Sequence, residues 1–334
     1  MSALLYEKIH SLFRGLEKKS LPALCLELLS EQKKQWEGLR EGYESLKAIR
    51  ERDIACNGFS VRLQHNPRRL RNSLAGTGEK GVSGQQCFLC LDHLPEGQKG
   101  ILYRDEYLIL PNPMPVFPSH FTVSHLDHRP QDITEPIDTF LHLMADFGPD
   151  WAVLYNGPKC GASAPDHLHF QAVPSGQMPI EAEIREEKRL ALVTRIDEGV
   201  LYRLRNLGRE VIVLEGYEST AMKGMFIRLL KALRNVLALD EEPMMNVAGF
   251  HNPKKWRLVI FPRRKHRPDA FFREGANRVV VSPGVIDMGG VIITPVTKDF
   301  DRLDATAVEG VYREVSLERE IVKRATEMMV SAPS

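Results

Sequence analysis

The sequence predicts an α+β protein in which a helical N-terminal extension precedes two similar halves. Three observations support this prediction. Residues 2–54 have apolar positions three or four apart, which is a helical period. Short apolar runs that alternate like strands begin at residue 59. The order of strands, helix and strands then occurs twice, which suggests a weak internal duplication although no repeat can be aligned by eye.

The N-terminal extension, residues 1–54, is expected to be helical throughout. Leu4, Ile9, Leu12 and Leu16 fall on one helical face, and Pro22 is expected to break the segment into two helices. The first half, residues 55–185, is expected to hold strands at 59–64, 101–110, 120–124 and 151–155, with a Gly-rich loop at 75–84 and a helix at 135–147.

The second half, residues 186–334, repeats this order. Strand-like runs occupy 190–214, a helical pattern covers 219–238, and two further strands are expected on either side of 253–255. A charged amphipathic helix is expected near 304–330.

Length and composition limit the function classes. A chain of 334 residues with a formal net charge of +1 can build a large core, but it has no field that attracts nucleic acid or an anionic membrane over long range. Every apolar run is far shorter than the roughly 20 residues of a membrane-spanning helix. The N-terminus lacks the features of a secretory signal, and an odd number of cysteines fits a reducing compartment, so a cytoplasmic location is expected.

One segment, residues 155–171, carries most of the chemical information. A loop of Gly161, Ala162 and Ser163 leaves room for phosphate oxygens to approach backbone N–H groups and a hydroxyl. The alternation that follows places His167, His169 and Gln171 on one strand face. A neutral imidazole is a good nucleophile at phosphorus and a good leaving group once phosphorylated, so a double displacement is chemically natural here.

A plainer interpretation also exists for these residues. Two histidines on a strand face are often ordinary polar side chains or zinc ligands only. The adjoining Asn156-Gly157 and the small-residue loop favour the phosphate-transfer interpretation.

The motif His-Leu-His-Phe-Gln at 167–171 resembles the signature of the transferase branch of the histidine-triad superfamily, which includes galactose-1-phosphate uridylyltransferase, the diadenosine tetraphosphate phosphorylases and the GDP-hexose phosphorylases. The resemblance covers about residues 59–300 and implies two histidine-triad-like halves with antiparallel sheets and flanking helices. It implies that His169 is the nucleophile and that Gln171 and Ser163 assist it at the phosphate. Asn112, Asn156, Gly161 and Ala162 would bind the nucleotide.

Gln171 stands where the hydrolase branch of that superfamily has a third histidine. Glutamine cannot act as an acid, so transfer to a phosphate acceptor is favoured over hydrolysis. The expected reaction moves a nucleoside monophosphate between a nucleotide sugar or nucleoside polyphosphate and a sugar 1-phosphate or inorganic phosphate. Two alternatives stay open: a non-catalytic nucleotide- or zinc-binding protein on the same scaffold, and a dinucleoside polyphosphate hydrolase.

Cys87 and Cys90 have a spacing that fits tetrahedral zinc, and His128 and His167 can supply two nitrogens. Some uridylyltransferases bind zinc in a similar arrangement, so the resemblance strengthens this prediction of a structural zinc. His125 competes with His128 for the role, and the alternative is a pair of reduced cysteines packed as small apolar groups. Magnesium is expected only as a companion of the nucleotide.

Two basic clusters, at 62–71 and 263–267, resemble segments of the GDP-hexose phosphorylases. Arg68 is the favoured phosphate ligand in the first, and Arg264 and Lys265 in the second. The plainer interpretation is a solvated charge run, and the net charge of +1 argues against a nucleic-acid surface. The expected partners are a nucleotide or nucleotide sugar and a phosphate-bearing acceptor, with no nucleic acid and no membrane, and a homodimer is left open.

Overall fold

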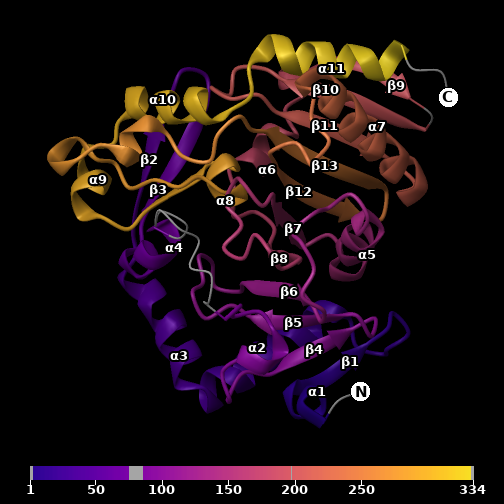
Figure 1. Ribbon diagram of the computed structural model, residues 1–334, viewed down its shortest axis with the longest axis vertical. Helices are drawn as coiled ribbons and strands as arrows, with labels where there is room; N and C mark the ends of the chain where they lie inside the picture. Colours follow the sequence, from indigo (N-terminus) through magenta and orange to yellow (C-terminus); the bar gives the residue numbers. More distant parts are fainter. Residues whose placement is uncertain (1–2, 75–85, 197, 332–334) are drawn as a thin grey trace.

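The computed structural model describes residues 3–74, 86–196 and 198–331, and it confirms the predicted α+β class (Figure 1). The predicted loop at 75–84 lies outside these residues. The described chain forms one sheet of eleven strands and one of three. The strands of the large sheet are β1 (Ile9–Phe13), β4 (Gly100–Tyr103), β5 (Tyr107–Pro111), β6 (Phe121–His125), β7 (Trp151–Asn156), β8 (His169–Pro174), β9 (Leu190–Ile196), β10 (Gly199–Leu204), β11 (Ile212–Gly216), β12 (Met245–Asn252) and β13 (Lys255–Pro262).

The two halves share this large sheet. Its strand order is β1-β4-β5-β6-β8-β7-β12-β13-β11-β10-β9, so the halves meet where β7 pairs with β12 in antiparallel register. Asn156 lies directly opposite Asn246 in this pair. The end of β7 in the first half is therefore in contact with the first residues of a strand from the second half.

The small sheet also joins distant parts of the chain. It contains β2 (Arg50–Ala55), β3 (Ser60–His65) and β14 (Val291–Thr294), and β14 runs parallel to β3 with Ile292 opposite Leu63. This pairing crosses the expected boundary at residue 185, as the β7–β12 pair does. The division of the chain into those units stays a prediction.

The N-terminal extension is mainly helical, with α1 (Ala3–Lys8), α2 (Leu21–Gln35) and α3 (Glu37–Glu44), but two of its segments are strands. β1 forms the edge of the large sheet and pairs in parallel with β4. The pairing provides hydrogen-bond partners for backbone groups on that side of β4, which would otherwise be an open edge. Leu16, expected within the helical pattern, lies between β1 and α2 and is 94% exposed. Pro22 lies in the first turn of α2, behind the cap Ser20, where proline is tolerated because that N–H needs no helical partner.

Helices cover the large sheet on one side, and the small sheet with other helices covers part of the other side. The first layer buries the alternate side chains Phe121, Phe170 and Leu214 against α2, α5 (Ile137–Phe147), α7 (Ser219–Leu237) and α11 (Arg319–Ser331). The second layer packs Leu63, Ile292 and Val259 with α8 (Val285–Met288) and α10 (Ala305–Val315). The C-terminal segment thus forms two helices in place of the single one expected. The remaining helices are α4 (Leu70–Leu74), α6 (Ile180–Glu183) and α9 (Thr297–Arg302).

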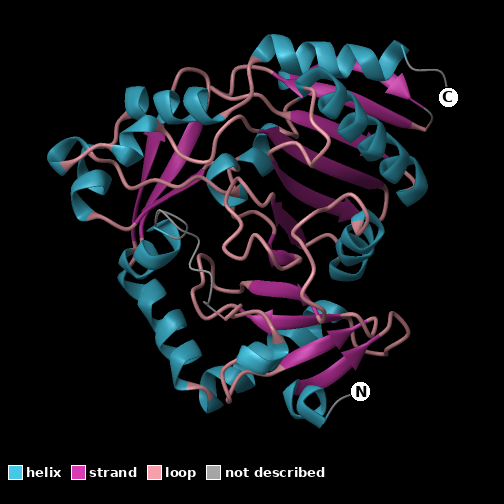
Figure 2. Ribbon diagram, viewed as in Figure 1, coloured by secondary structure: helices cyan, strands magenta, loops and turns pink. Residues whose placement is uncertain are grey.

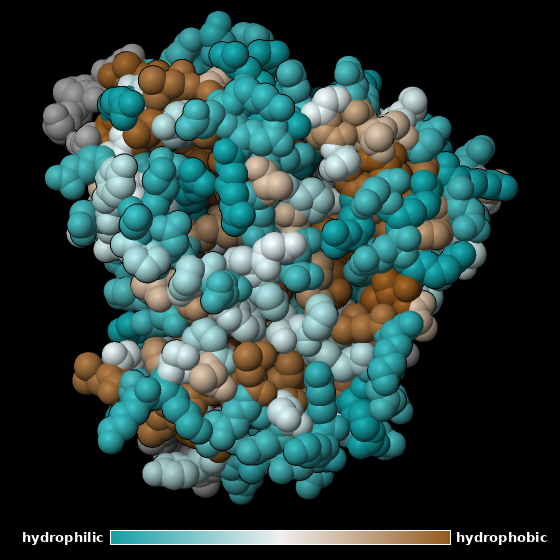
Figure 3. Space-filling model, turned by 180° about the vertical axis from the view of Figure 1, so that it is seen from behind, coloured by the Kyte–Doolittle hydropathy of each residue, from teal (hydrophilic) through white to brown (hydrophobic). Residues whose placement is uncertain are grey.

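Figure 2 shows the helices mostly at the outside of the molecule with the strands between them. The opposite side is hydrophilic over most of its area, with separate apolar patches (Figure 3). Within the described ranges, no helix combines the length and apolar character needed to cross a bilayer.

Candidate active site and metal cluster

A cavity of about 410 Å³ lies over the sheet face that β5, β6 and β8 present away from α2 and α5. The alternation of β8 decides what faces it: Phe170 enters the core, whereas His169 and Gln171 line the cavity. The segment around residues 112–114, the loop 161–163, helix α4 and the segments 266–267 and 282–287 close the other sides. This size suits a nucleotide-sized ligand.

His169 is held in one tautomer. Its Nδ1–H donates to the carbonyl oxygen of His167 at 2.8 Å, so the lone pair is on Nε2. Its backbone N–H donates to Oε1 of Gln131 at 2.8 Å, and Nε2 of Gln131 donates back to the carbonyl of His169 at 3.0 Å. Burial lowers the pKa of His169 to about 4, so the imidazole is neutral at physiological pH. The residue has the ionisation state that a nucleophile needs.

Gln171 is oriented by a histidine that the sequence analysis did not select. The backbone N–H of Val116 donates to Nδ1 of His120 at 3.2 Å, which leaves the ring proton on Nε2. That Nε2–H donates to Oε1 of Gln171 at 2.7 Å. Burial lowers the pKa of His120 to about 4, so the ring stays neutral. With its oxygen engaged, Gln171 has its NH₂ group available as a donor for a phosphate oxygen.

The loop before the motif approaches the cavity as the sequence suggests. Gly161, Ala162 and Ser163 all line it, and Ser163 is exposed. Gly161 has a φ of +114°, and a Cβ there would lie 2.8 Å from the Cα of Gly284. Only glycine satisfies both conditions. Asn156 also lines the cavity, as does Asn112, whose Oδ1 accepts from the N–H of Met114 at 2.9 Å.

The cations that face the cavity are not the ones favoured from the sequence. Arg69 and Arg267 line it, and Arg69 donates to the carbonyl of Met114 at 2.8 Å while Arg267 donates to Oγ of Ser282 at 2.9 Å. Arg68, one residue away, points outward and pairs with Glu41 at 3.2 Å.

Arg264 and Lys265 are likewise not among the residues that line the cavity. Arg264 pairs with Glu318, and Lys265 pairs with Asp269 and Glu314, all on the surface near α10 and α11. Their side chains are occupied by carboxylates at a distance from the motif. Each basic run therefore contributes one guanidinium to the cavity, whereas Arg68, Arg264 and Lys265 form surface ion pairs.

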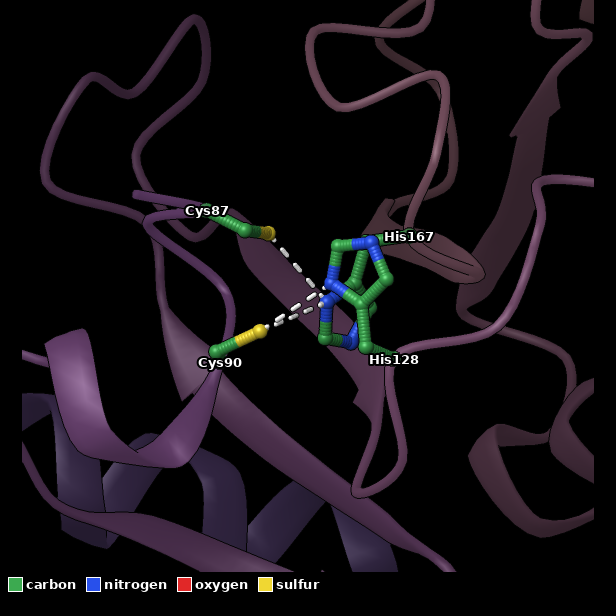
Figure 4. A group of neighbouring side chains, drawn as sticks. All are labelled: Cys87, Cys90, His128 and His167. Carbon is green, nitrogen blue, oxygen red and sulfur yellow. Dashed lines mark hydrogen bonds between the residues drawn. The ribbon is translucent and has the colours of Figure 1, made fainter. Parts of the chain in front are cut away.

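A second group of functional side chains lies at the side of the motif (Figure 4). The ligand atoms of Cys87, Cys90, His128 and His167 all lie within 4.8 Å of one another. Sγ of Cys87 is 3.3 Å from Nδ1 of His167, and Sγ of Cys90 is 3.1 Å from Nδ1 of His128. The donor set is the one that tetrahedral structural zinc prefers.

The ring nitrogens that face away from this cluster have acceptors, which is the arrangement that orients metal ligands. Nε2 of His167 donates to the carbonyl of His125 at 2.9 Å, and Nε2 of His128 is 3.4 Å from a carboxylate oxygen of Asp166. The ring of His125 is engaged elsewhere, since its Nδ1 accepts from the N–H of Asp127 at 2.9 Å. Of the two candidates, His128 is the one in the cluster.

The cysteine chemistry also fits a cation. Burial and the adjacent Cys87 raise the pKa of Cys90 to about 11. A bound cation would stabilise the thiolate form of Cys90 at neutral pH. The four residues therefore fit a zinc ion.

The fold matches that of yeast Ap4A phosphorylase Apa2 in two crystal structures. The complex with AMP is 15% identical with a TM-score of 0.52, and the match covers 86% of this chain and 96% of that chain. The complex with Ap4A is 14% identical with a TM-score of 0.54, covering 86% of this chain and 97% of that chain. The expected α+β fold with two halves is confirmed by this match, and at these identities the likeness concerns the fold alone.

A family model, described as a domain of unknown function (DUF4922), matches residues 28–174. The matched segment ends with β8 and so includes the motif at 167–171. Comparison with curated proteins finds no significant match.

Proposed function

We propose that the protein is a nucleotidyltransferase of the phosphorylase type that carries a nucleoside monophosphate on His169. The observation that carries this proposal is the state of that histidine: a buried, neutral ring whose Nδ1 proton is fixed on a carbonyl, on a residue that lines a nucleotide-sized cavity together with Gln171. The fold shared with an Ap4A phosphorylase supports the same class of reaction.

The first step forms one bond and breaks one. The Nε2 lone pair of His169 attacks the α-phosphorus of the donor, and the bond from phosphorus to the bridging oxygen breaks, so the leaving phosphate departs with that electron pair. The ring then carries a positive charge, which the hydrogen bond from Nδ1–H to the carbonyl of His167 stabilises. In the second step a phosphate oxygen of the acceptor attacks phosphorus, and the P–N bond pair returns to the imidazole.

Donor groups of residues that line the cavity would stabilise the negative charge on the nonbridging phosphate oxygens. The NH₂ groups of Gln171 and Asn156, the hydroxyl of Ser163 and the guanidinium groups of Arg69 and Arg267 all border the cavity. Preorganised donors of this kind supply much of the rate in phosphoryl-type transfers. Cys87, Cys90, His128 and His167 would hold zinc, which would fix His167 and through its carbonyl the ring of His169.

The favoured acceptor is a phosphate, either inorganic or on a sugar. Neither His120 nor Gln171 can serve as an acid at neutral pH, since the first is neutral with a low pKa and the second does not ionise. Release to water, which a hydrolase needs, is disfavoured. A non-catalytic nucleotide-binding protein would not need the lone pair of His169 to face the cavity.

The test is covalent labelling. The protein is incubated separately with α-³²P-labelled GTP, UDP-glucose, GDP-glucose and Ap4A, quenched in alkali and assayed for acid-labile label. We expect label with at least one donor on the native chain and on His142→Asn, an exposed histidine of α5, and none on His169→Asn. Nucleotide binding without label in the native chain would favour the alternative of a non-catalytic nucleotide-binding protein.

A further inference from the structure

Arg263 is buried beneath the segments that close the cavity. Its side chain is 1% exposed, and all five N–H donors have acceptors. Nε donates to the carbonyl of Val315, Nη1 to Oδ1 of Asn246 and the carbonyl of Pro283, and Nη2 to the carbonyls of Lys265 and His266. Among the described residues, no carboxylate forms an ion pair with it. The guanidinium thus joins the two backbone segments that border the cavity from the second half.

The donors of Arg263 fix the orientation of Asn246. A guanidinium has no acceptor, so the atom of Asn246 that faces it must be the oxygen Oδ1. The NH₂ group of Asn246 then points the other way, where it donates to the carbonyl of Cys160 at 2.7 Å and to Oδ1 of Asn156 at 2.8 Å. The cross-strand pair of β7 and β12 places the two amides opposite each other.

The orientation of Asn156 follows from the same logic. Its Oδ1 accepts from Asn246 and also from the backbone N–H of Val285 at 2.7 Å. Within the described part of the chain, its Nδ2 donates to no other group, and Asn156 borders the cavity. The NH₂ group of Asn156 is therefore held as a donor toward the space beside His169.

We propose that Arg263 and Asn246 are positioning residues: through a chain of donors from Arg263 to Asn246 to Asn156, the second half of the molecule fixes a phosphate-binding donor of the first half. The inference rests on the proposed function, because Asn156 needs this orientation only if an anion binds there. A turn of the Asn156 amide by 180° would present an oxygen to the phosphate and convert an attraction into a repulsion.

One substitution separates positioning from folding. Asn246→Asp keeps the shape of the side chain and an oxygen for Arg263, and it gives that buried guanidinium a carboxylate partner. It removes the donor to Oδ1 of Asn156, so the Asn156 amide would turn and donate to the new carboxylate instead. The matched control is Arg52→Lys, since Arg52 also clamps carbonyl oxygens, those of Phe300 and Leu303, but does not line the cavity.

The experiment measures the single-turnover labelling rate of His169 with the donor that labels the native chain, together with the melting temperature. We expect Asn246→Asp to label at least about 10-fold more slowly while it stays folded at the assay temperature, with a melting temperature lowered because its second oxygen faces the carbonyl of Cys160. Arg263→Lys should be slowed in the same direction, and Arg52→Lys should be unaffected. If Asn246→Asp does not fold, Asn246→Ala removes the same donor without adding charge, and a smaller slowing in the same direction is expected, because the N–H of Val285 still donates to Oδ1 of Asn156.

Labelling of Asn246→Asp at the native rate would overturn the positioning role while leaving the proposed function intact. An equal slowing of Arg52→Lys would reduce the effect to general stability and overturn it too. Failure of every donor to label the native chain would overturn the proposed function, and the positioning role with it.

Discussion

Nδ1–H of His169 donates to the backbone carbonyl of His167 at 2.8 Å, while the ring of His167 lies in the Cys87, Cys90 and His128 cluster. One residue therefore belongs to both sites: its side chain is a candidate metal ligand, and its backbone orients the candidate nucleophile. Loss of a metal from this cluster would remove one of the contacts that orient the ring of His167 and leave the hydrogen bond from its Nε2 to the carbonyl of His125, so His169 would be held less firmly.

Metal content gives the first prediction. Purified protein should contain about one zinc per chain, because the donor set fits a closed tetrahedral site. Cys90→Ser should lose the metal and lower both the melting temperature and the labelling rate, whereas Cys56→Ser, a half-buried cysteine outside the cluster, should keep all three. Elemental analysis and thermal unfolding measure this. Full zinc occupancy in Cys90→Ser would contradict the assigned ligand set.

The pH dependence of labelling gives the second prediction. His169 attacks only when neutral, and burial lowers its pKa to about 4. The labelling rate should therefore stay level from pH 8 down to about pH 5 and fall about tenfold per unit below pH 4. Ap4A suits this measurement because all its phosphates are internal and none titrates near pH 6. A rate that already falls near pH 6.5 would mean that the ring is solvated and ordinary.

Two neighbouring arginines give the third prediction. Arg69→Ala should weaken nucleotide binding by about 1.5–3 kcal/mol, the range for a hydrogen bond to a charged group, which is roughly a 10- to 150-fold rise in the dissociation constant. Arg68→Ala should change it less than about 2-fold, because Arg68 pairs with Glu41 outside the cavity. Calorimetric titration with AMP, UMP and GMP compares the two. Equal losses of nucleotide affinity in both variants would indicate that the arginines act through their charge at a distance and would contradict a direct contact by Arg69.

The Arg68 and Arg69 pair also illustrates what the sequence could predict and where it stopped. Strand alternation was enough to place His169 and Gln171 on one face, but His167, expected on the same face, precedes β8 and its ring lies with Cys87, Cys90 and His128. The Cys-x-x-Cys spacing was enough to group Cys87 with Cys90. Within a basic run, however, the phase of a short turn decides which guanidinium points inward, and spacing alone does not define that phase. The sequence therefore does not distinguish Arg68, the residue it favours, from Arg69, the residue that faces the cavity.

The same limit explains the other differences. His120 orients Gln171 from a strand start flanked by proline-rich sequence, and its role depends on a pairing of β6 with β8 that no local pattern encodes. Ile9–Phe13 has a helical period yet forms a strand, because the edge of β4 offers backbone partners that a local pattern does not reveal. A histidine directly before a buried strand and opposite the motif is the signal that could have identified His120.

The fate of the intermediate gives the fourth prediction. Gln171→His introduces an imidazole where the chain has a side chain that cannot transfer protons. Hydrolysis of the labelled intermediate should rise by at least about 10-fold relative to transfer to inorganic phosphate, because general acid or base catalysis is worth about 10²–10⁴. Gln98→His, at another glutamine that lines the cavity, is the matched control and should leave the ratio unchanged. If the ratio of hydrolysis to phosphate transfer is unchanged in both variants, Gln171 is not the reason that transfer to phosphate is favoured.

The most direct measurement maps the covalent adduct. The protein labelled by its best donor is quenched in alkali and digested, and mass spectrometry locates the nucleotidyl group, after which a second sample is chased with inorganic phosphate. We expect a single modified peptide with the nucleotide on His169, lost on the chase as the corresponding nucleoside diphosphate appears. Steady-state turnover with no adduct, or an adduct on another residue such as His120 or His266, would contradict the assignment of His169 as the nucleophile.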